Sequence, residues 1–309
     1  MVFSLPSDTS FLQLGILFLV STVLAACGQE NSSQTYRPQF TSNPPQTKTK
    51  YVLGVHPLHN PVLLQEVFGP LVTYLNTNIS DATFSLEASK DYGAYEAKLY
   101  ARKFDFALPN PYQTVNSLQH GYRIFAKMGD DQNFRGIILV RKDSGINSVS
   151  DLKGKKVSSP APTALASTML PQHYLQTHGI NVLQDIETLY VGSQESSIMN
   201  VYQGNVAAAT TWIPPWLAFI KTRPDVAQAV KVMWTTAPLP NNSLIARDDI
   251  PPEIVAKVRA LLLNLHNTAE GRVILARMEL SRFEAADEHT YQPVRDFLED
   301  FKRRVRPLN

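Results

Sequence analysis

The chain has 309 residues, and its 29 Lys and Arg against 27 Asp and Glu give a formal net charge of +2 at pH 7. It lacks the basic face or stripe that nucleic-acid binding requires, so the composition argues against that class of partner. Hydrophobic residues make up 44% and charged residues 18%, as in an ordinary globular protein. Because chains above roughly 250 residues usually divide their core, the length favours two lobes.

The N-terminus differs in composition from the rest of the chain. Residues 11–26 form an uncharged apolar run that ends in a Leu-Ala-Ala-Cys motif at Cys27, the sole cysteine. This stretch resembles a bacterial lipoprotein signal, in which residues 1–26 are removed and the cysteine is lipidated and becomes the mature N-terminus. The alternative is a transmembrane anchor, but about sixteen residues fall short of the roughly twenty that span a bilayer.

A polar segment separates this signal from the folded part. Residues 27–50 are rich in Gln, Ser, Thr, Asn and Pro, a composition that cannot build a core and that predicts a flexible tether. The folded part is expected to begin near Tyr51. The sequence therefore predicts a protein that is lipid-anchored to a bacterial membrane, with its globular part in the periplasm or at the cell exterior.

From Tyr51 onward, short β-rich runs alternate with helical patterns. This alternation predicts βαβ units and mainly parallel sheets, in which ligands bind outside the carboxyl ends of the strands. In the first helix, Asn60 is expected to be the N-cap and Pro61 the first residue, with one apolar face formed by Leu64, Phe68, Leu71, Val72 and Leu75. Later helices are expected at residues 94–102, 164–178, 252–267, 269–278 and 291–304.

The stretch from Val157 to Leu170 is the most informative part of this pattern. It reads as a strand end, a loop of small and hydroxyl-bearing residues, and the start of a helix, for which Thr163 is expected to be the cap. Because the first backbone N–H groups of a helix lack intrahelical partners and the macrodipole is positive there, such a loop can hold an anion. The alternative is that Ser159, Pro162 and Thr163 only end a strand and cap a helix.

Several motifs follow one another in a characteristic order: Ser-Lys-Asp-Tyr at 89–92, Val-Arg-Lys-Asp-Ser-Gly-Ile at 140–146 followed by Lys-Gly-Lys at 153–155, Gly-Ser-Gln-Glu at 192–195, and Pro-Leu-Pro-Asn at 238–241. In this order they resemble the substrate-binding proteins of phosphonate, phosphite and phosphate ABC importers. The resemblance spans about residues 51–304.

The resemblance implies an α/β fold of the periplasmic-binding-protein type. Each of two lobes would be a mainly parallel sheet flanked by helices, and hinge strands would join them. Lobe 1 would comprise residues 51–140 and 235–309, and lobe 2 residues 141–234. The long strand that ends at Val140 and the run from Trp234 to Asn242 would be the crossovers.

The resemblance also implies a function. A monomer would close its lobes on a small oxyanion of the phosphonate, phosphite or phosphate type and pass it to an ABC importer permease. The candidate ligand-binding residues are Tyr92, Asn110, Tyr112, Ser159, Thr163, Ala164, Glu195 and Thr210.

The central loop departs from the family pattern. Where the family commonly has Ser-Thr-Ser-Gly, this chain has Pro162, Thr163, Ala164 and Leu165, so only Thr163 keeps the family hydroxyl. We therefore expect the anion to be held more weakly, or to be a different one, and Thr163 to matter most among the loop residues.

Several candidate residues also have ordinary structural interpretations. Tyr92 and Tyr112 could be packing residues of the core. Glu195 could face the amine of an aminoalkyl ligand, or it could be a charge at a helix N-terminus. Thr210 could donate its hydroxyl, or it could simply suit a strand.

Catalytic and metal-binding patterns are missing from the sequence. It has no Ser-His-Asp, paired-carboxylate or phosphate-cradling Gly-rich signature, and its histidines lack metal-site spacing. We expect no enzyme activity, cofactor or metal. Two other functions stay open: a ligand-sensing lipoprotein of the same fold, and an enzyme similar to the pyrimidine-precursor synthases.

Overall fold

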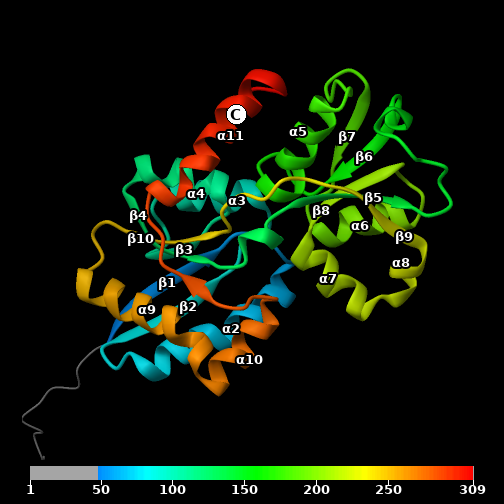
Figure 1. The fold of residues 1–309 in the computed structure, drawn as a ribbon. Helices are drawn as coiled ribbons and strands as arrows, with labels where there is room; N and C mark the ends of the chain where they lie inside the picture. Colours follow the sequence, from blue (N-terminus) through cyan, green and yellow to red (C-terminus); the bar gives the residue numbers. More distant parts are fainter. Residues whose placement is uncertain (1–47, 309) are drawn as a thin grey trace, which may run out of the picture. The chain divides into compact units, whose positions relative to one another are not determined.

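The computed structural model describes residues 48–308, which form two β-sheets flanked by helices (Figure 1). The signal of residues 1–26, Cys27 and the tether up to residue 47 lie outside the described residues, so these predictions stay predictions. Thr49 and Lys50, which were predicted to belong to the tether, instead lie in the first strand. None of the helices within 48–308 is both long and apolar enough to cross a membrane.

Six strands form the first sheet and five form the second. The first contains β1 (Thr49–Val55), β2 (Ala82–Glu87), β3 (Phe106–Leu108), β4 (Tyr122–Met128), β10 (Ser243–Arg247) and β11 (Phe283–Glu284), in the order β11-β4-β10-β3-β1-β2. The second contains β5 (Gly136–Arg141), β6 (Lys155–Ser159), β7 (Ile186–Tyr190), β8 (Ala208–Trp212) and β9 (Val230–Thr235), in the order β7-β6-β8-β5-β9.

Both sheets are mixed, which corrects the expectation of mainly parallel sheets. β1 runs parallel to β2 and β3, and β6 runs parallel to β7 and β8. β10 is antiparallel to β3 and β4, and β5 is antiparallel to β8 and β9. β5 and β10 are the strands by which the chain enters each sheet directly from the other sheet. They lack the helical crossover that a parallel neighbour requires, and therefore run in the opposite direction.

The helices are α2 (Pro61–Asn78), α3 (Tyr92–Tyr100), α4 (Pro111–Ser117), α5 (Leu170–Thr177), α6 (Gln194–Tyr202), α7 (Ile213–Thr222), α8 (Pro224–Ala229), α9 (Pro252–Asn264), α10 (Ala269–Arg277) and α11 (Gln292–Arg304). A π-helix spans Leu165–Met169, and short 3₁₀ helices span Leu118–His120, Asp131–Asn133, Val149–Leu152, Leu265–Asn267 and His289–Tyr291.

Helix α2 forms as the sequence predicts. Asn60 is the N-cap, and its Oδ1 accepts a hydrogen bond from the Leu63 N–H (3.1 Å), with Pro61 at the first position. The helix packs against β2, α9 and α10 beside the first sheet (Figure 1). Its predicted apolar face is buried in full: Leu64, Phe68, Leu71, Val72 and Leu75.

Two connections, residues 129–135 and 236–242, lead from one sheet to the other. β5 pairs within the second sheet, so the first connection ends before Gly136. The sequence analysis had instead assigned residues up to 140 to lobe 1. The division into lobes of residues 51–140 plus 235–309 and residues 141–234 stays a prediction.

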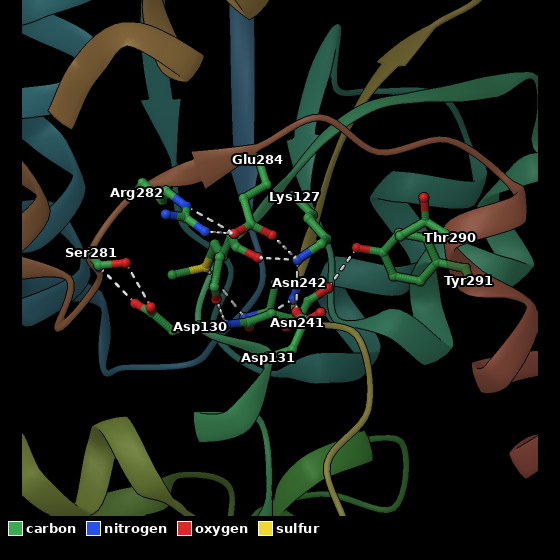
Figure 2. A network of polar contacts seen from close by, with 12 residues as sticks. Lys127, Asp130, Asp131, Asn241, Asn242, Ser281, Arg282, Glu284, Thr290 and Tyr291 are labelled. Carbon is green, nitrogen blue, oxygen red and sulfur yellow. Dashed lines mark hydrogen bonds and ion pairs between the residues drawn. The ribbon is translucent and has the colours of Figure 1, made fainter. Parts of the chain in front are cut away.

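A polar network ties these two connections together, as Figure 2 shows. Lys127 Nζ donates to Asp131 Oδ1 (2.8 Å) and to Glu284 Oε2 (2.7 Å). Asp131 Oδ1 also accepts from the backbone N–H of Asn241 (3.0 Å), and Asn241 Nδ2 donates to the Gly129 carbonyl (2.8 Å). Because the Lys127 side chain is only 6% exposed, water screens this network less than a surface ion pair.

Candidate ligand-binding site

Loops from the two sheets meet after the carboxyl ends of β3 and β6. Asn110, after β3, caps α4: its Oδ1 accepts from the Gln113 N–H (3.1 Å), and Gln113 Oε1 accepts from the Asn110 N–H (3.0 Å). Asn110 Nδ2 donates to the carbonyl of Thr163 (3.0 Å), in the loop after β6. Ligands of parallel sheets bind at such strand ends, so this contact marks the candidate site.

The helix that follows this loop does not start as predicted. Ala164, not Thr163, holds the cap position, and no side chain caps it. The first turn is the π-helix Leu165–Met169, in which the N–H of Met169 bonds to the carbonyl of Ala164 (3.2 Å). The Thr163 carbonyl accepts a hydrogen bond from Asn110 Nδ2, and the Thr163 hydroxyl donates to Glu96 of α3. These two contacts hold Thr163 away from the cap position. Single π-helical turns are frequent at functional sites.

The hydroxyl of Thr163 faces a carboxylate. It donates to Glu96 Oε1 of α3 (2.5 Å), and this oxygen also accepts from Gln113 Nε2 (3.0 Å). Burial raises the pKa of the Glu96 carboxyl, while the hydrogen bonds from Gln113 and Thr163 lower it. An ionised Glu96 would repel an anion at this hydroxyl. In this conformation the Thr163 hydroxyl is therefore a hydrogen-bond donor to the Glu96 carboxylate and not to an anion.

Gln194 holds together the polar side chains at the start of α6. The residue is only 1% exposed. Its Nε2 donates to Ser167 Oγ (3.0 Å) and to the Tyr92 hydroxyl (3.4 Å), and its Oε1 accepts from Thr211 Oγ1 (2.8 Å). One amide thus orders hydroxyls from α3, the π-helix and β8.

Tyr92 is the first residue of α3, which begins two residues before the predicted helix at residues 94–102. Asp91 caps this helix by accepting from the Ala94 N–H (2.7 Å). The buried Tyr92 ring forms a small apolar cluster with Ala161 and Ala164. Burial raises the pKa of the Tyr92 hydroxyl, so it stays protonated near neutral pH and can donate a hydrogen bond.

Glu195 lies beside a neutral histidine. Its Oε1 is 3.9 Å from His59 Nδ1, and its Oε2 is buried without a hydrogen-bond partner among residues 48–308. Burial lowers the pKa of His59 to about 4, so at pH 7 this contact is no ion pair. Burial also lowers the pKa of His56 to about 4, and His56 Nδ1 lies 2.9 Å from the carbonyl of Leu108.

The remaining candidate residues lie in the interior. Ser159 Oγ and Thr210 Oγ1 are 2.7 Å apart and buried, so the two hydroxyls bond to each other. Tyr112 is buried in the core, and burial raises its pKa. The structure therefore pairs Asn110 with Thr163, Tyr92 with Ala164, Ser159 with Thr210, and Glu195 with His59.

The sequence analysis missed Gln194, Ser167, His59 and Glu96. Gln194 lies inside the quoted motif at residues 192–195, directly after the capping Ser193, and this position was its only signal. No sequence pattern pointed to Ser167, because Thr163 was expected to supply the hydroxyl at the start of this helix. Within residues 48–308, no group of three or more His, Cys, Asp or Glu side chains is arranged to hold a metal ion.

Comparison with known sequences identifies the family. The profile described as "ABC transporter, phosphonate, periplasmic substrate-binding protein" matches residues 53–291. The chain is 21% identical over 163 residues to the phosphonates-binding periplasmic protein of Escherichia coli K12, covering 52% of this chain and 48% of that protein. It is 21% identical over 197 residues to the probable ABC transporter phosphite binding protein of Prochlorococcus marinus MIT 9301, covering 60% and 65%. The matches thus span less than two thirds of either relative.

Solved structures share the fold. A binding protein component of an ABC phosphonate transporter from Pseudomonas aeruginosa superposes with a TM-score of 0.77 at 19% identity, covering 83% of this chain and 88% of that chain. The PhnD1 protein of Prochlorococcus marinus MIT 9301, in complex with methylphosphonate, gives a TM-score of 0.76 at 17% identity, covering 82% and 99%. Because the family profile covers residues 53–291, most of the chain, and these structures share its fold, the chain belongs to the family of periplasmic substrate-binding proteins of ABC phosphonate transporters.

Proposed function

We propose that this protein captures a phosphonate-type oxyanion beside Tyr92, Ser167 and Gln194 and delivers it to an ABC importer permease. The observation that carries the proposal is the direction of the hydrogen bonds. Gln194 Nε2 donates to both hydroxyls, so the hydroxyl hydrogens of Tyr92 and Ser167 are not used in these bonds and can point to an anion.

The ligands of related proteins support the choice of anion. The Escherichia coli relative is named for phosphonates, the Prochlorococcus relative for phosphite, and the PhnD1 structure contains methylphosphonate. These ligands share a phosphorus-centred oxyanion, which hydroxyl and amide donors bind by charge-assisted hydrogen bonds. Tyr92 and Ser167 would supply donors in place of the hydroxyls that Pro162 and Ala164 lack.

The other candidate residues have more limited roles in this proposal. Asn110 and Ala164 shape the loop, and Glu195 borders the site. The Thr163 hydroxyl could donate to an anion only by giving up Glu96, and the hydroxyls of Ser159 and Thr210 are bonded to each other in the interior. We therefore place Tyr92 and Ser167 ahead of Thr163 as anion donors.

A second part of the proposal concerns the cellular address. We propose that Cys27 is lipidated and anchors the protein to a bacterial membrane, with residues 51–309 in the periplasm or at the cell exterior. Intact-mass spectrometry of protein from the membrane fraction should find a mature chain that begins at Cys27 and carries a diacyl adduct. A soluble product that retains Met1 would contradict the anchor.

Calorimetric titration with phosphate, phosphite and methylphosphonate tests the ligand. We expect at least one to bind, and Tyr92→Phe to weaken it about tenfold or more, because a hydrogen bond to a charged group contributes about 1.5–3 kcal/mol. Tyr190→Phe is the matched control, because the Tyr190 ring is exposed; its affinity should equal that of the wild type.

The titration can also fail in two informative ways. If none of the three compounds binds below millimolar concentration, the family's ligand class does not carry over to this chain. If one binds tightly and Tyr92→Phe leaves its affinity unchanged, the anion binds elsewhere.

A further inference from the structure

The last helix of the chain reaches from the first sheet to the second. α11 follows β11 of the first sheet and packs against α4, and it also contacts α5, which packs on β5 of the second sheet (Figure 1). The buried face of α11 consists of Val294, Leu298 and Phe301. We call residues 300–306, at the end of this helix, the C-terminal strap.

Arg306 of the strap binds the loop that follows β6. Its Nη2 donates to the carbonyl of Pro162 (2.6 Å), 144 residues away in the sequence, and its Nε donates to Gln172 Oε1 of α5 (3.1 Å). The guanidinium lies over the ring of the buried Phe301, 5.1 Å from the ring centroid. Because the donors of a guanidinium form a rigid planar fork, one side chain holds the loop and α5 together.

Asp300 makes the second contact of the strap with α5. Its Oδ2 lies 2.7 Å from His173 Nε2, and its Oδ1 accepts from Arg304 Nε (2.8 Å). Hydrogen bonds from Arg304, His173 and Arg303 lower the pKa of the Asp300 carboxyl, so it is ionised near neutral pH. Because an ionised carboxylate can only accept, His173 Nε2 is the donor in this contact.

The loop that the strap holds borders the proposed anion site. It comprises residues 160–164 and joins β6 to the π-helix. Ala161 and Ala164 of this loop form a buried cluster with Tyr92. Pro162 lies between these two alanines, and its carbonyl accepts from Arg306. The contact with Arg306 therefore bears on the position of the loop relative to Tyr92.

We propose that the C-terminal strap positions the loop of residues 160–164 against Tyr92, so that Arg306 and Asp300 set how long a bound anion is retained without touching it. The inference rests on the proposed function and adds residues that act on the same site from outside it. Release of an anion beside Tyr92 would require the loop to move away, and this movement would break the Arg306 contacts. Interactions made only in the ligand-retaining conformation favour that conformation and act mainly on the rate of release.

Stopped-flow measurement of methylphosphonate binding tests the strap. Arg306→Ala should raise the dissociation rate about three- to tenfold, the factor that one net hydrogen bond contributes, and leave the association rate nearly unchanged. A loss of stability alone would lower the amount of folded protein but not change the dissociation rate of the folded part. His173→Ala, which removes the other contact with α5, should act in the same direction.

Two further variants locate the effect. Arg306→Lys should recover part of the wild-type rate, because the ammonium group can still donate to the Pro162 carbonyl but lacks the fork. Arg272→Ala is the matched control: this exposed arginine of α10 also donates to a backbone carbonyl, that of His266 (3.2 Å), but the bond spans only six residues. Arg272→Ala should keep the wild-type rates.

Hydrogen exchange in the ligand-free protein tests the strap without any ligand. The N–H groups of Thr168 and Met169 bond to the carbonyl of Ala164 (2.8 and 3.2 Å), so their exchange reports local opening at the end of the loop. Arg306→Ala should speed their exchange about three- to tenfold, whereas Arg272→Ala should not.

The two measurements separate this inference from the proposed function. Unchanged exchange of the two amides in Arg306→Ala would overturn the strap, whether or not a ligand binds. Faster exchange with an unchanged dissociation rate would mean that the loop does not control release, which also overturns the inference. If the wild type binds none of methylphosphonate, phosphite and phosphate while the exchange is faster in Arg306→Ala, the proposed function falls and the positioning of the loop stands.

Discussion

A single buried amide, that of Gln194, sets the positions of the polar side chains in the proposed site. Its two ends bond to hydroxyls from three separate elements, those of Tyr92, Ser167 and Thr211. A buried amide can be replaced only at the cost of leaving these partners unsatisfied. In the proposed site, Gln194 would therefore act on the anion mainly through the side chains that it holds.

The first prediction concerns the stability that this amide provides. Gln194→Ala should lower the free energy of unfolding by about 1–3 kcal/mol, because the Thr211 hydroxyl loses its acceptor in a buried setting. Urea denaturation of the ligand-free protein measures it. Gln184→Ala, at an exposed position, is the control and should change stability by less than about 0.5 kcal/mol. Equal effects of the two variants would contradict the role of Gln194.

The second prediction concerns pH. Burial lowers the pKa of His56 and of His59 to about 4, below the value of about 6.5 in an unfolded chain. Between these two values the unfolded state binds more protons than the folded state, so the free energy of unfolding falls as pH is lowered through this window. Each histidine contributes at most roughly 3 kcal/mol.

Urea denaturation at several pH values between about 6.5 and 4 checks this slope. His59→Gln should flatten the pH dependence. His178→Gln should leave it unchanged, because His178 is exposed. A wild-type slope in His59→Gln would mean that His59 is not held neutral by burial.

Between elements, the Lys127 network joins the two connections. Lys127 lies in β4, Asp131 in the first connection, Asn241 in the second and Glu284 in β11 (Figure 2). The buried ammonium group of Lys127 donates to two carboxylates, and one of them, Asp131, also accepts a hydrogen bond from the backbone of the second connection. Lys127 therefore contacts the first connection directly and the second connection through Asp131.

The third prediction tests this dependence. Lys127→Met should destabilise the protein by about 2–3 kcal/mol, less than the 3–5 kcal/mol for a fully buried pair, because both carboxylates are partly exposed. Lys257→Met is the control: its Nζ lies 2.6 Å from Asp81 Oδ2, but the Lys257 side chain is 48% exposed, so the loss should be below about 1 kcal/mol. Equal losses in urea denaturation would contradict the special role of Lys127.

Local signals predicted some elements and failed at others for physical reasons. Asn60 and Pro61 predicted the start of α2 correctly, because a cap and an apolar face are both properties of neighbouring residues. Thr163 looked like a cap as well, but its carbonyl and hydroxyl bond to Asn110 and Glu96. These partners are 53 and 67 residues away in the sequence, and no local pattern contains them.

At the scale of the whole molecule, the alternation of strands and helices predicted an α/β fold. It did not predict the direction of β5 and β10, because strand direction depends on how the chain passes between two sheets and not on apolar periodicity. The candidate site was predicted only in part, because its contacts also depend on how distant segments of the chain meet. Tyr92 and Glu195 were named, whereas Gln194, which touches Tyr92 and precedes Glu195, was not.

A crystal structure of the protein with methylphosphonate tests the central claim most directly. We predict that the phosphonate oxygens lie within hydrogen-bond distance of the Tyr92 and Ser167 hydroxyls, with Gln194 Nε2 still donating to both. An anion bound by Thr163 at the start of the π-helix, or bound away from Tyr92 and Ser167 altogether, would contradict the account.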